Sequence, residues 1–572
     1  TTFKFLSAAL VLIFYFVFMS FKTPTPHHRM HLPKVKTPPI QFGHAVKYSI
    51  SPDPEKLRRT RDAMQHTWYA YRNHAWGHDG IKPVSGKPDD SRNGWGAFIV
   101  DSSTTLALMD LWSELKLNIQ HILRIDFTQA IGLVDPFETT IRYLGGMLSL
   151  IEMSDAGLIP EKVIDQDERD QLLAQAVTLA EKLGPAFDTP TGLPWPRVDF
   201  KRNIGTWVPD PGSDHDKDHE KDPNKPPSDP PSIGPARAGT NILEYHTLSK
   251  LTGDATYINN ATRAWTSLVW PKKEERMRGL VEGPINILTG KVTKPHANWD
   301  GGHDSFYEYL LKASLLIPSN RHTAHYQKRF HQAATSLREH LTSRSAYEIT
   351  PDIHLTQHLF LGKRLGPHLL NEQSHLACFA PATLLLATAH LRRPDLRPLA
   401  RALLESCHHL ATSTPSNLPP ELARWMPATP PYENASFAPE SSAEWAQLSK
   451  HAFWAPDPAY HLRPEYFESL FVAYRVTGEA RYRDWAWEAF EAIDRRCRAR
   501  YGYAGLVDVM AAGTETKTGE GKGDGEKNSG RIDLQESWWA AETVKYAFLI
   551  FGSGGMGGLD EWVFSTEGHL FR

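Results

Sequence analysis

Apolar side chains recur at every third or fourth position through most of residues 51–572. This spacing gathers them on one face of a helix. It predicts helices at Thr139–Asp155, Arg169–Phe187, Thr240–Leu251, Ser305–Leu316, Arg321–Leu341, Phe467–Val476 and Glu536–Phe551. Long alternating strands are scarce, and short runs such as GLVDVM predict only small β-hairpins. The pattern therefore predicts an all-α domain.

Two distant segments share one pattern, LTGDATYINNATRAW and VTGEARYRDWAWEAF, and each follows an amphipathic helix. Gly253 and Gly478 stand where the end of a helix takes a left-handed residue. Asp254 and Glu479 then suit the start of a second helix, whose dipole favours an acid. Both segments therefore predict helix–turn–helix hairpins, and a repeated hairpin indicates stacked or toroidal helices. Two copies do not distinguish an open solenoid from a closed ring.

The N-terminal segment predicts attachment to a membrane. Residues 5–21 read FLSAALVLIFYFVFMSF without a charge, between Lys4 and Lys22. This length is at the short end for a membrane helix, but it exceeds a usual signal-peptide core, and no cleavage pattern follows. We expect a transmembrane signal anchor behind a cytosolic tail at residues 1–4, with a cleaved signal or a buried helix as alternatives. Residues 22–50, rich in Pro, His and Lys, predict an extended stem.

The charge composition argues against nucleic acid as a partner. The chain has 63 Lys and Arg against 66 Asp and Glu, so no basic field is present for nucleic acid. Two polar runs, 209–232 and 513–530, nearly lack apolar residues and predict solvated, flexible insertions. The three cysteines form neither a disulfide scaffold nor a metal-ligand pattern. One disulfide and one free thiol would fit an oxidising compartment.

Acidic residues within apolar or aromatic runs are candidates for glycoside hydrolysis, which needs carboxyl groups on both sides of the scissile bond. Four runs contain them: Glu138 with Arg142 in VDPFETTIRYLGGMLSL, Asp304 in HANWDGGHDSFYEYLL, Glu465 and Glu468 beside Arg463 in HLRPEYFESLFVAYR, and Glu536 and Glu542 around two Trp in QESWWAAETVKYAFLIF. In a helical ring, these helix N-termini would meet at one mouth.

Each acid also has an ordinary structural interpretation. Glu138 suits a first-turn partner of Arg142, Asp304 an N-cap, and Glu465 a solvated helix start. Competing chemistries lack their motifs, since the chain has no GxSxG, Walker lysine loop, HExxH or dinucleotide-binding glycines. Local chemistry alone therefore leaves the acids undecided.

Ordered blocks along the chain resolve the choice. They are YRNHAWGHDGIKPVSG, GWGAFIVDSSTTLALM, DPFETTIRYLGGMLSL, LEYHTLSKLTGD, GGHDSFYEYLLK, HLACFAPATLLL, RPEYFESLFVAYRVTG, ESWWAAETVKYAFLIF and VFSTEGH. From about Arg61 to its end, the chain resembles the class I α1,2-mannosidases, glycoside hydrolase family 47. The resemblance implies an (α/α)7 barrel. It also implies an inverting mannosyl-oligosaccharide 1,2-α-mannosidase, of fungal or Golgi type, that acts on high-mannose N-glycans.

The resemblance also implies roles for particular residues. Glu138, Asp304 and Glu465 match the three essential acids. Glu138 would be the acid, acting through water, Glu465 the base, and Asp304 a third carboxylate whose role stays open. Further residues match positions that line the sugar pocket: Arg142, Glu244, His375, Arg463, Glu468, Trp538, Glu542 and Glu567.

A calcium ion and a disulfide follow from the same resemblance. Family members bind one Ca²⁺ at the barrel base through the hydroxyl and carbonyl of a Thr, which is Thr566 here; oxygen ligands suit this ion. Cys378 and Cys407 match a family disulfide, which leaves Cys497 unpaired. Asn260 and Asn434 begin N-glycosylation sequons, which fit a luminal protein.

Together these features predict a monomeric, single-pass type II protein of the Golgi or endoplasmic reticulum membrane, with a luminal catalytic domain. Many endoplasmic reticulum members carry Arg where this chain has Gly302, so we expect a roomier outer subsite and broader trimming. Arg237 and Ser374 stand where relatives often carry an acid.

Three alternatives stay open. They are a degradation-enhancing mannosidase-like factor of quality control, a non-catalytic mannose-binding lectin on the same barrel, and a helical scaffold. The short stretch after His569 disfavours the first. The retained acids disfavour the second, because buried charges are costly without a function. A scaffold would not explain acids among Trp and Phe.

Overall fold

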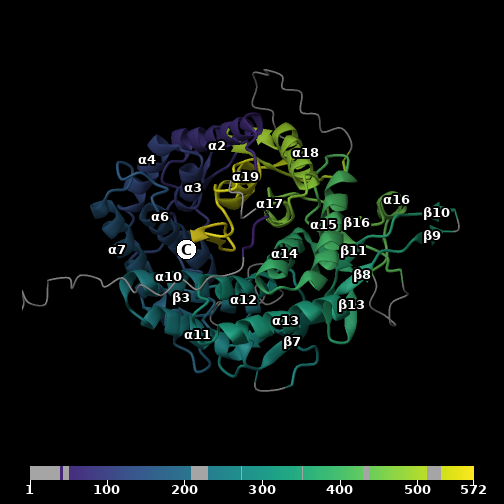
Figure 1. The fold of residues 1–572 in the computed structure, drawn as a ribbon, viewed down its shortest axis with the longest axis horizontal. Helices are drawn as coiled ribbons and strands as arrows, with labels where there is room; N and C mark the ends of the chain where they lie inside the picture. The colour runs from purple at the N-terminus through teal and green to yellow at the C-terminus, as the bar shows by residue number, and fades with distance from the viewer. Residues whose placement is uncertain are drawn as a thin grey trace, which may run out of the picture.

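The computed structural model describes residues 39–42, 50–207, 230–271, 274–350, 352–428, 437–511 and 530–572. They form a helix-rich domain with small antiparallel sheets (Figure 1). The expected anchor, nearly all of the stem and of both polar insertions, and the sequon at Asn434 lie outside this part of the chain. Within it, no helix has the length and apolar character needed to cross a membrane.

Among the described residues, seven helices form an inner ring in which each contacts the next (Figure 1). The ring closes because α19, with the π-helical turn η5 before it, packs against α3. The inner helices are α3 (Ala97–Leu108), α6 (Gly145–Asp155), α10 (Ile242–Thr252), α12 (Asp304–Leu316), α14 (Ala380–His390), α17 (Glu465–Thr477) and α19 (Val544–Leu549), and η5 spans Trp539–Thr543.

One outer helix packs on each inner helix of the described chain, which gives the (α/α)7 arrangement that the resemblance implies. In the same order, the outer helices are α4 (Trp112–Ile122), α7 (Gln166–Leu183), α11 (Thr256–Val269), α13 (Thr323–His340), α15 (Arg397–Thr412), α18 (Arg481–Arg496) and α2 (Pro54–His74). Shorter helical segments are α5 (Pro136–Thr139), η1 (Thr140–Leu144), η2 (Gly184–Phe187), α9 (Pro235–Gly239), η3 (His375–Phe379), η4 (Pro394–Leu396) and α16 (Ser442–His451).

The two rings differ in burial, as their sequences require. Every residue of α3 is buried, because an inner helix is surrounded by its neighbours. Outer helices such as α18 bury one face only. Gly253 and Gly478 end α10 and α17 in the left-handed conformation, with φ of 78° and 73°, and both predicted hairpins are confirmed.

Extended structure exceeds the small hairpins that the sequence predicts. A five-stranded sheet has the order β13 (His368–Leu370), β12 (Lys363–Leu365), β7 (Val292–Ala297), β6 (Gly283–Asn286), β5 (Ser232–Ile233), and a three-stranded sheet joins β14 (Glu372–Ser374), β15 (Leu422–Arg424) and β16 (Trp454–Asp457). Two-stranded pairs are β1 (Gly80–Ile81) with β2 (Pro88–Asp89), β3 (Arg197–Asp199) with β4 (Ile204–Thr206), β8 (Thr342–Arg344) with β11 (Leu359–Leu361), β9 (Glu348–Thr350) with β10 (Ile353–His354), β17 (Arg498–Ala499) with β18 (Gly502–Tyr503), β19 (Gly505–Leu506) with β20 (Arg531–Ile532), and β21 (Val563–Phe564) with β22 (Leu570–Phe571).

Two residues of the expected stem, Ile40 and Gln41, contact the helical domain. Ile40 is 6% exposed and lines a small cavity with Lys312, Phe471 and other inner-ring residues. The N–H groups of Ile40 and Gln41 donate to Asp560 Oδ1 at 2.6 and 3.2 Å. The Pro-rich composition of the segment did not indicate this contact. A single buried isoleucine makes it, and one residue hardly changes the composition.

Candidate active site

Glu138 lies in α5, directly before the π-helical turn η1 that carries Arg142. Asp135 caps α5, since its Oδ1 accepts the N–H of Phe137 and of Glu138. Glu138 Oε2 accepts hydrogen bonds from Arg142 Nε and Arg92 Nη1, both at 2.9 Å. Burial opposes ionisation, but the charges of Arg142 and Arg92 lower the pKa of Glu138 to about 2. This carboxyl is therefore an anion at neutral pH.

Asp304 is the first residue of α12, and its Oδ1 accepts the N–H of Ser305 at 2.8 Å. Desolvation, together with repulsion from Asp300, Glu308 and Glu465, raises the pKa of Asp304 to about 7. The surroundings of Asp304 thus raise its pKa, whereas the surroundings of Glu138 lower the pKa of that carboxyl. A carboxyl with such a pKa can hold and release a proton near neutral pH, as a general acid must.

Glu465 is the first residue of α17, and its Oε2 lies 2.7 Å from Nδ1 of the buried His375 in η3. Burial opposes ionisation, but the hydrogen bond from His375 and the charge of Arg463 lower the pKa of Glu465. Glu421 holds the Arg463 guanidinium through contacts of 2.6–2.9 Å. The ring centroid of Trp538 lies 5.1 Å from that guanidinium. Glu465 is therefore an oriented carboxylate.

Arg142 is buried and connects several elements of the inner ring. Besides Glu138, its guanidinium contacts Asp101 of α3 at 3.3 Å and forms an ion pair with Glu567 near the C-terminus. Its Nη1 also lies 3.3 Å from the Ser537 hydroxyl. The arginine therefore ties α3, η1 and the C-terminal hairpin to the carboxylate of Glu138.

Further predicted pocket residues form a buried acidic group beside these. Lys312 Nζ lies 3.3 Å from Glu468, and burial raises the pKa of Glu468 to about 8. Glu542 lies in η5, where burial and the charges of Glu567, Glu465 and Glu468 raise its pKa well above the usual range. Burial likewise raises the pKa of Glu567 to about 8. The interior therefore carries more carboxyl groups than the neighbouring cations neutralise.

Glu244, the weakest candidate from the sequence, lies fully buried in α10. Its Oε1 accepts the Tyr309 hydroxyl at 2.6 Å, and burial raises the pKa of Glu244 to about 7. The same Tyr309 oxygen lies 3.3 Å from the N–H of Thr566. Glu244 thus joins the site through Tyr309.

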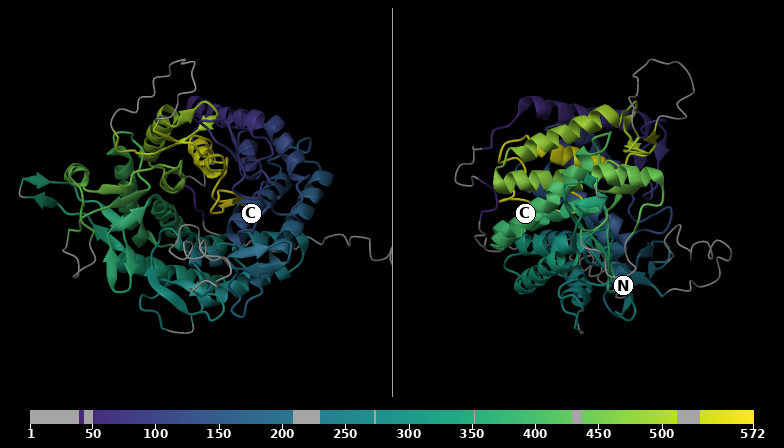
Figure 2. Two further views of the ribbon diagram at one scale, coloured as in Figure 1. Left: turned by 180° about the vertical axis from the view of Figure 1, so that it is seen from behind. Right: turned by 90° about the vertical axis from the view of Figure 1, so that its right-hand side faces the viewer.

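Thr566 and Glu567 lie in the turn between β21 and β22, and this hairpin lies inside the ring (Figure 1 and Figure 2). The strands contact α12 and α6, and Lys545 of α19 donates to Gly568 O at 2.6 Å. Nowhere in the described chain do three or more His, Cys, Asp or Glu side chains form a metal-binding group. The hydroxyl and carbonyl of Thr566 are oxygen donors of the kind that Ca²⁺ takes.

These connected acids can be compared with known proteins. The model of glycosyl hydrolase family 47 matches residues 63–572. The chain belongs to glycosyl hydrolase family 47. This family 47 chain is 34% identical over 553 residues to a probable mannosyl-oligosaccharide alpha-1,2-mannosidase 1B of Aspergillus clavatus, covering 95% of this chain and 96% of the relative.

Two further relatives agree. The mannosyl-oligosaccharide alpha-1,2-mannosidase 1B of Aspergillus phoenicis is 34% identical over 517 residues, 89% of this chain and 90% of the relative. The structure of an alpha-1,2-mannosidase from Trichoderma reesei matches with a TM-score of 0.78 at 32% identity, covering 91% of this chain and 99% of that chain. The family 47 chain is therefore a glycoside hydrolase.

Several contacts of the candidate acids were not predicted from the sequence. Arg92 bridges Glu138 and Glu536, with Nη1 2.9 Å from one carboxylate and Nη2 3.1 Å from the other. Asp101 reaches Arg142 from α3, and Glu421 holds the arginine beside Glu465. Arg92 and Glu421 lie in irregular segments, so no helical spacing marks them. Asp101, an acid in the apolar run GWGAFIVDSSTTLALM, was a visible signal.

The family-based disulfide is confirmed: Cys378 in η3 is bonded to Cys407 in α15, with their Cα atoms 6.0 Å apart. Cys497 is free and buried, and burial raises the pKa of its thiol. Asn260, the sequon inside the described chain, lies partly exposed in α11.

The positions that depart from the family also have structural explanations. Gly302 is exposed with φ of 89°, and a Cβ added there would meet no atom within 4 Å. The position is therefore open, but its left-handed backbone also favours glycine by itself. Arg237 pairs with Asp135 at 2.7 Å, and the Ser374 hydroxyl donates to Asp300.

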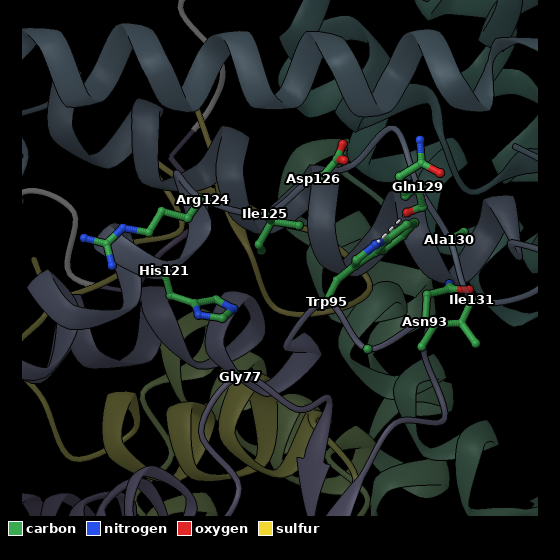
Figure 3. Close-up of a pocket in the computed structure, with 11 residues that line it drawn as sticks. Gly77, Asn93, Trp95, His121, Arg124, Ile125, Asp126, Gln129, Ala130 and Ile131 are labelled. Atoms are coloured by element: carbon green, nitrogen blue, oxygen red, sulfur yellow. Dashed lines mark hydrogen bonds between the residues drawn. The ribbon is translucent and has the colours of Figure 1, made fainter.

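A cavity of about 420 Å³ lies beside the loop that carries Arg92 (Figure 3). Its walls include Asn93, His121, Arg124 and Gln129, and the Trp95 indole donates to Gln129 O at 3.0 Å. The residues that line it do not include Glu138, Asp304 or Glu465. The cavity therefore lies beside the loop that carries Arg92 and is separate from the candidate acids.

Proposed function

We propose that this family 47 hydrolase removes terminal α1,2-linked mannose from high-mannose N-glycans by an inverting, Ca²⁺-dependent reaction. The observation that carries the mechanism is that two carboxyls at the starts of inner helices, Asp304 of α12 and Glu465 of α17, have pKa values shifted in opposite directions. The pKa of Asp304 is raised to about 7, whereas that of Glu465 is lowered. Carboxyls pushed apart in this way suit a proton donor and a base. The similarity to mannosyl-oligosaccharide alpha-1,2-mannosidases supports the substrate.

In this mechanism Asp304 donates its proton to the glycosidic oxygen as the bond breaks. Glu465, held by His375, takes a proton from the water that attacks the anomeric carbon on the opposite face. A single displacement of this kind inverts the configuration. Glu138, ionised between Arg142 and Arg92, supplies negative charge to the oxocarbenium-like transition state. This division moves the donor role from Glu138, where the resemblance places it, to Asp304.

Thr566 would hold the calcium ion, with sugar hydroxyls and water completing its oxygen ligands. When bound, Ca²⁺ supplies positive charge that orients these hydroxyls. The buried carboxyls of Glu542 and Glu567, which repel each other near this turn, make a surrounding that favours a cation. The Thr566 donors therefore fit the ion.

We also propose that the chain works as a monomer in the lumen of the Golgi or endoplasmic reticulum, held by residues 5–21. The bond between Cys378 and Cys407 supports an oxidising compartment. Membrane extraction of the tagged full chain with carbonate and with detergent tests the anchor. Release by carbonate alone would contradict it.

The activity is tested by incubating the full chain with a nine-mannose N-glycan, with and without a calcium chelator. Mass spectrometry should show stepwise loss of mannose that stops on chelation, and proton NMR should show β-mannose as the first product. Release of α-mannose would contradict inversion. Glycan binding without release would indicate a lectin instead.

A further inference from the structure

A buried carboxylate outside the acid cluster organises the loop that carries Arg92. Asp79, 4% exposed, accepts the N–H groups of Arg92 and Gly94 on Oδ2 at 2.7 and 2.6 Å. Its Oδ1 accepts the N–H groups of Gly96 and Ala97 at 3.0 and 3.1 Å. Four backbone donors therefore converge on one side chain, an arrangement that binds anions.

The loop needs this carboxylate because its backbone is unusual. Asn93, Gly94 and Gly96 all have positive φ, of 72°, 71° and 78°. The turn therefore points successive N–H groups inward, where Asp79 meets them. Ala97 also begins α3, whose dipole favours a negative charge at this end.

The same loop delivers a side chain to the reaction centre. The Arg92 guanidinium contacts Glu138 at 2.9 Å and Glu536 at 3.1 Å. The Tyr143 hydroxyl lies 3.0 Å from both Asp79 Oδ1 and the carbonyl oxygen of Arg92. Since Tyr143 belongs to η1, the turn that follows Glu138, both ends of the Arg92–Glu138 contact are tied to Asp79.

We propose that Asp79 and Arg92 are positioning residues for the reaction, in which Asp79 shapes the 90–97 loop so that Arg92 clamps Glu138 beside Arg142. This inference rests on the proposed function. Arg92 holds one oxygen of the Glu138 carboxylate and fixes the rotamer of that side chain. Asp79 acts by holding Arg92, both directly through the Arg92 N–H group and through Tyr143, which also contacts the Arg92 carbonyl oxygen. The cavity behind the loop lets it move once Asp79 is lost (Figure 3).

The first test measures kcat and KM on α1,2-mannobiose from pH 4 to 8. Arg92→Gln should lower kcat by about 10- to 100-fold, the effect of one charge-assisted hydrogen bond, with little change in KM. Glu138 has a pKa of about 2 in the wild type, so its protonation should not lower kcat down to pH 4. In the variant Glu138 loses one cation and its pKa rises, so kcat should fall at the acidic end of this range. Arg92→Lys should recover part of kcat. Other charged groups face Glu138 in all variants: Arg142, Arg237, Asp135 and Glu567.

Non-additivity separates positioning from a general loss of stability. Asp79→Asn should lower kcat nearly as much as Arg92→Gln, and the double variant should be no worse than Arg92→Gln alone. Asp560→Asn is the matched control, because Asp560 also accepts two backbone N–H groups, those of Ile40 and Gln41. It should lower thermal stability without changing the pH dependence of kcat.

Wild-type kcat in Arg92→Gln, or independent effects of Asp79→Asn and Arg92→Gln that multiply, would overturn the inference. A wild-type chain that releases no mannose would instead refute the proposed function. The crystal structure of Asp79→Asn then decides the positioning separately. In that structure the Arg92 guanidinium should no longer contact Glu138. An unchanged contact would contradict the proposal that Asp79 positions Arg92.

Discussion

The division of roles between Asp304 and Glu138 can be tested through the leaving group. Asp304→Asn removes the proposed proton donor without changing shape, and Glu138→Gln does the same for the proposed anion. A sugar leaving group needs a proton, whereas fluoride leaves without one. We therefore compare α1,2-mannobiose with α-mannosyl fluoride as substrates.

The structure supplies the magnitudes. With a pKa of about 7, Asp304 is about 90% protonated at pH 6 and about 10% at pH 8. The wild-type kcat should thus fall about tenfold across this interval, because the donor is active only when protonated. General acid catalysis contributes about 10²- to 10⁴-fold. Asp304→Asn should lose that factor on mannobiose and far less on the fluoride.

Stopped assays that quantify released mannose and fluoride give both rates. Glu138→Gln should slow both substrates, because a transition-state charge is lost whichever group leaves. Glu465→Gln should also slow both, because the attacking water loses its base. If Glu138→Gln spares the fluoride and Asp304→Asn does not, then Glu138 is the donor and the reasoning from their pKa values is wrong.

Four further changes have defined outcomes. Replacing Cys378 and Cys407 by Ser opens a loop with a sequence separation of 29 and should lower the free energy of unfolding, followed in guanidinium, by about 3.6 kcal/mol. Chelation should lower the Tm of the wild type, and calcium should restore it; Thr566→Val should respond to neither. Gly302→Arg should slow removal of outer mannoses, measured by glycan profiling, while Gly302→Ala should only cost about 1–2 kcal/mol in backbone strain. Glu542→Gln should raise thermal stability and lower kcat, since it removes a repelled buried acid.

Helix positions were predictable because the apolar period belongs to each segment alone. The expected helix at 305–316 is α12 (Asp304–Leu316), and that at 321–341 is α13 (Thr323–His340). Closure of the ring could not be predicted in this way, because it depends on the contact between α19 and α3, which lie far apart in the chain. The sheets were missed for a different reason. The strand β7 exposes four consecutive residues, so it lacks the alternation that marks a strand.

For the candidate active site, the sequence pointed to the acids but not to their ionisation. The pairing of Glu138 with Arg142 is a four-residue helical spacing and could be read directly. Arg92 lies 46 positions before Glu138, and only the fold brings it there. The raised pKa of Asp304 likewise comes first from burial inside the assembled ring and then from nearby acids, among them Glu465 of a different inner helix. The charges around each acid are therefore known only once the ring is assembled. The proposed assignment of proton donor and base depends on these charges.

The buried acids also indicate which kind of site this barrel contains. A site that only binds neutral sugars can use amides and hydroxyls, which are cheaper to bury than carboxyls. Here Glu468, Glu542 and Glu567 lie together, and their pKa values are raised by burial. Burying them costs stability, and Lys312 and Arg142 offset only part of it. Near neutral pH these three groups hold a proton, and positive charge that develops at the anomeric carbon favours their ionisation. A glycosidase with such a transition state can therefore use these buried carboxyls, whereas a lectin or a scaffold has no comparable use for them.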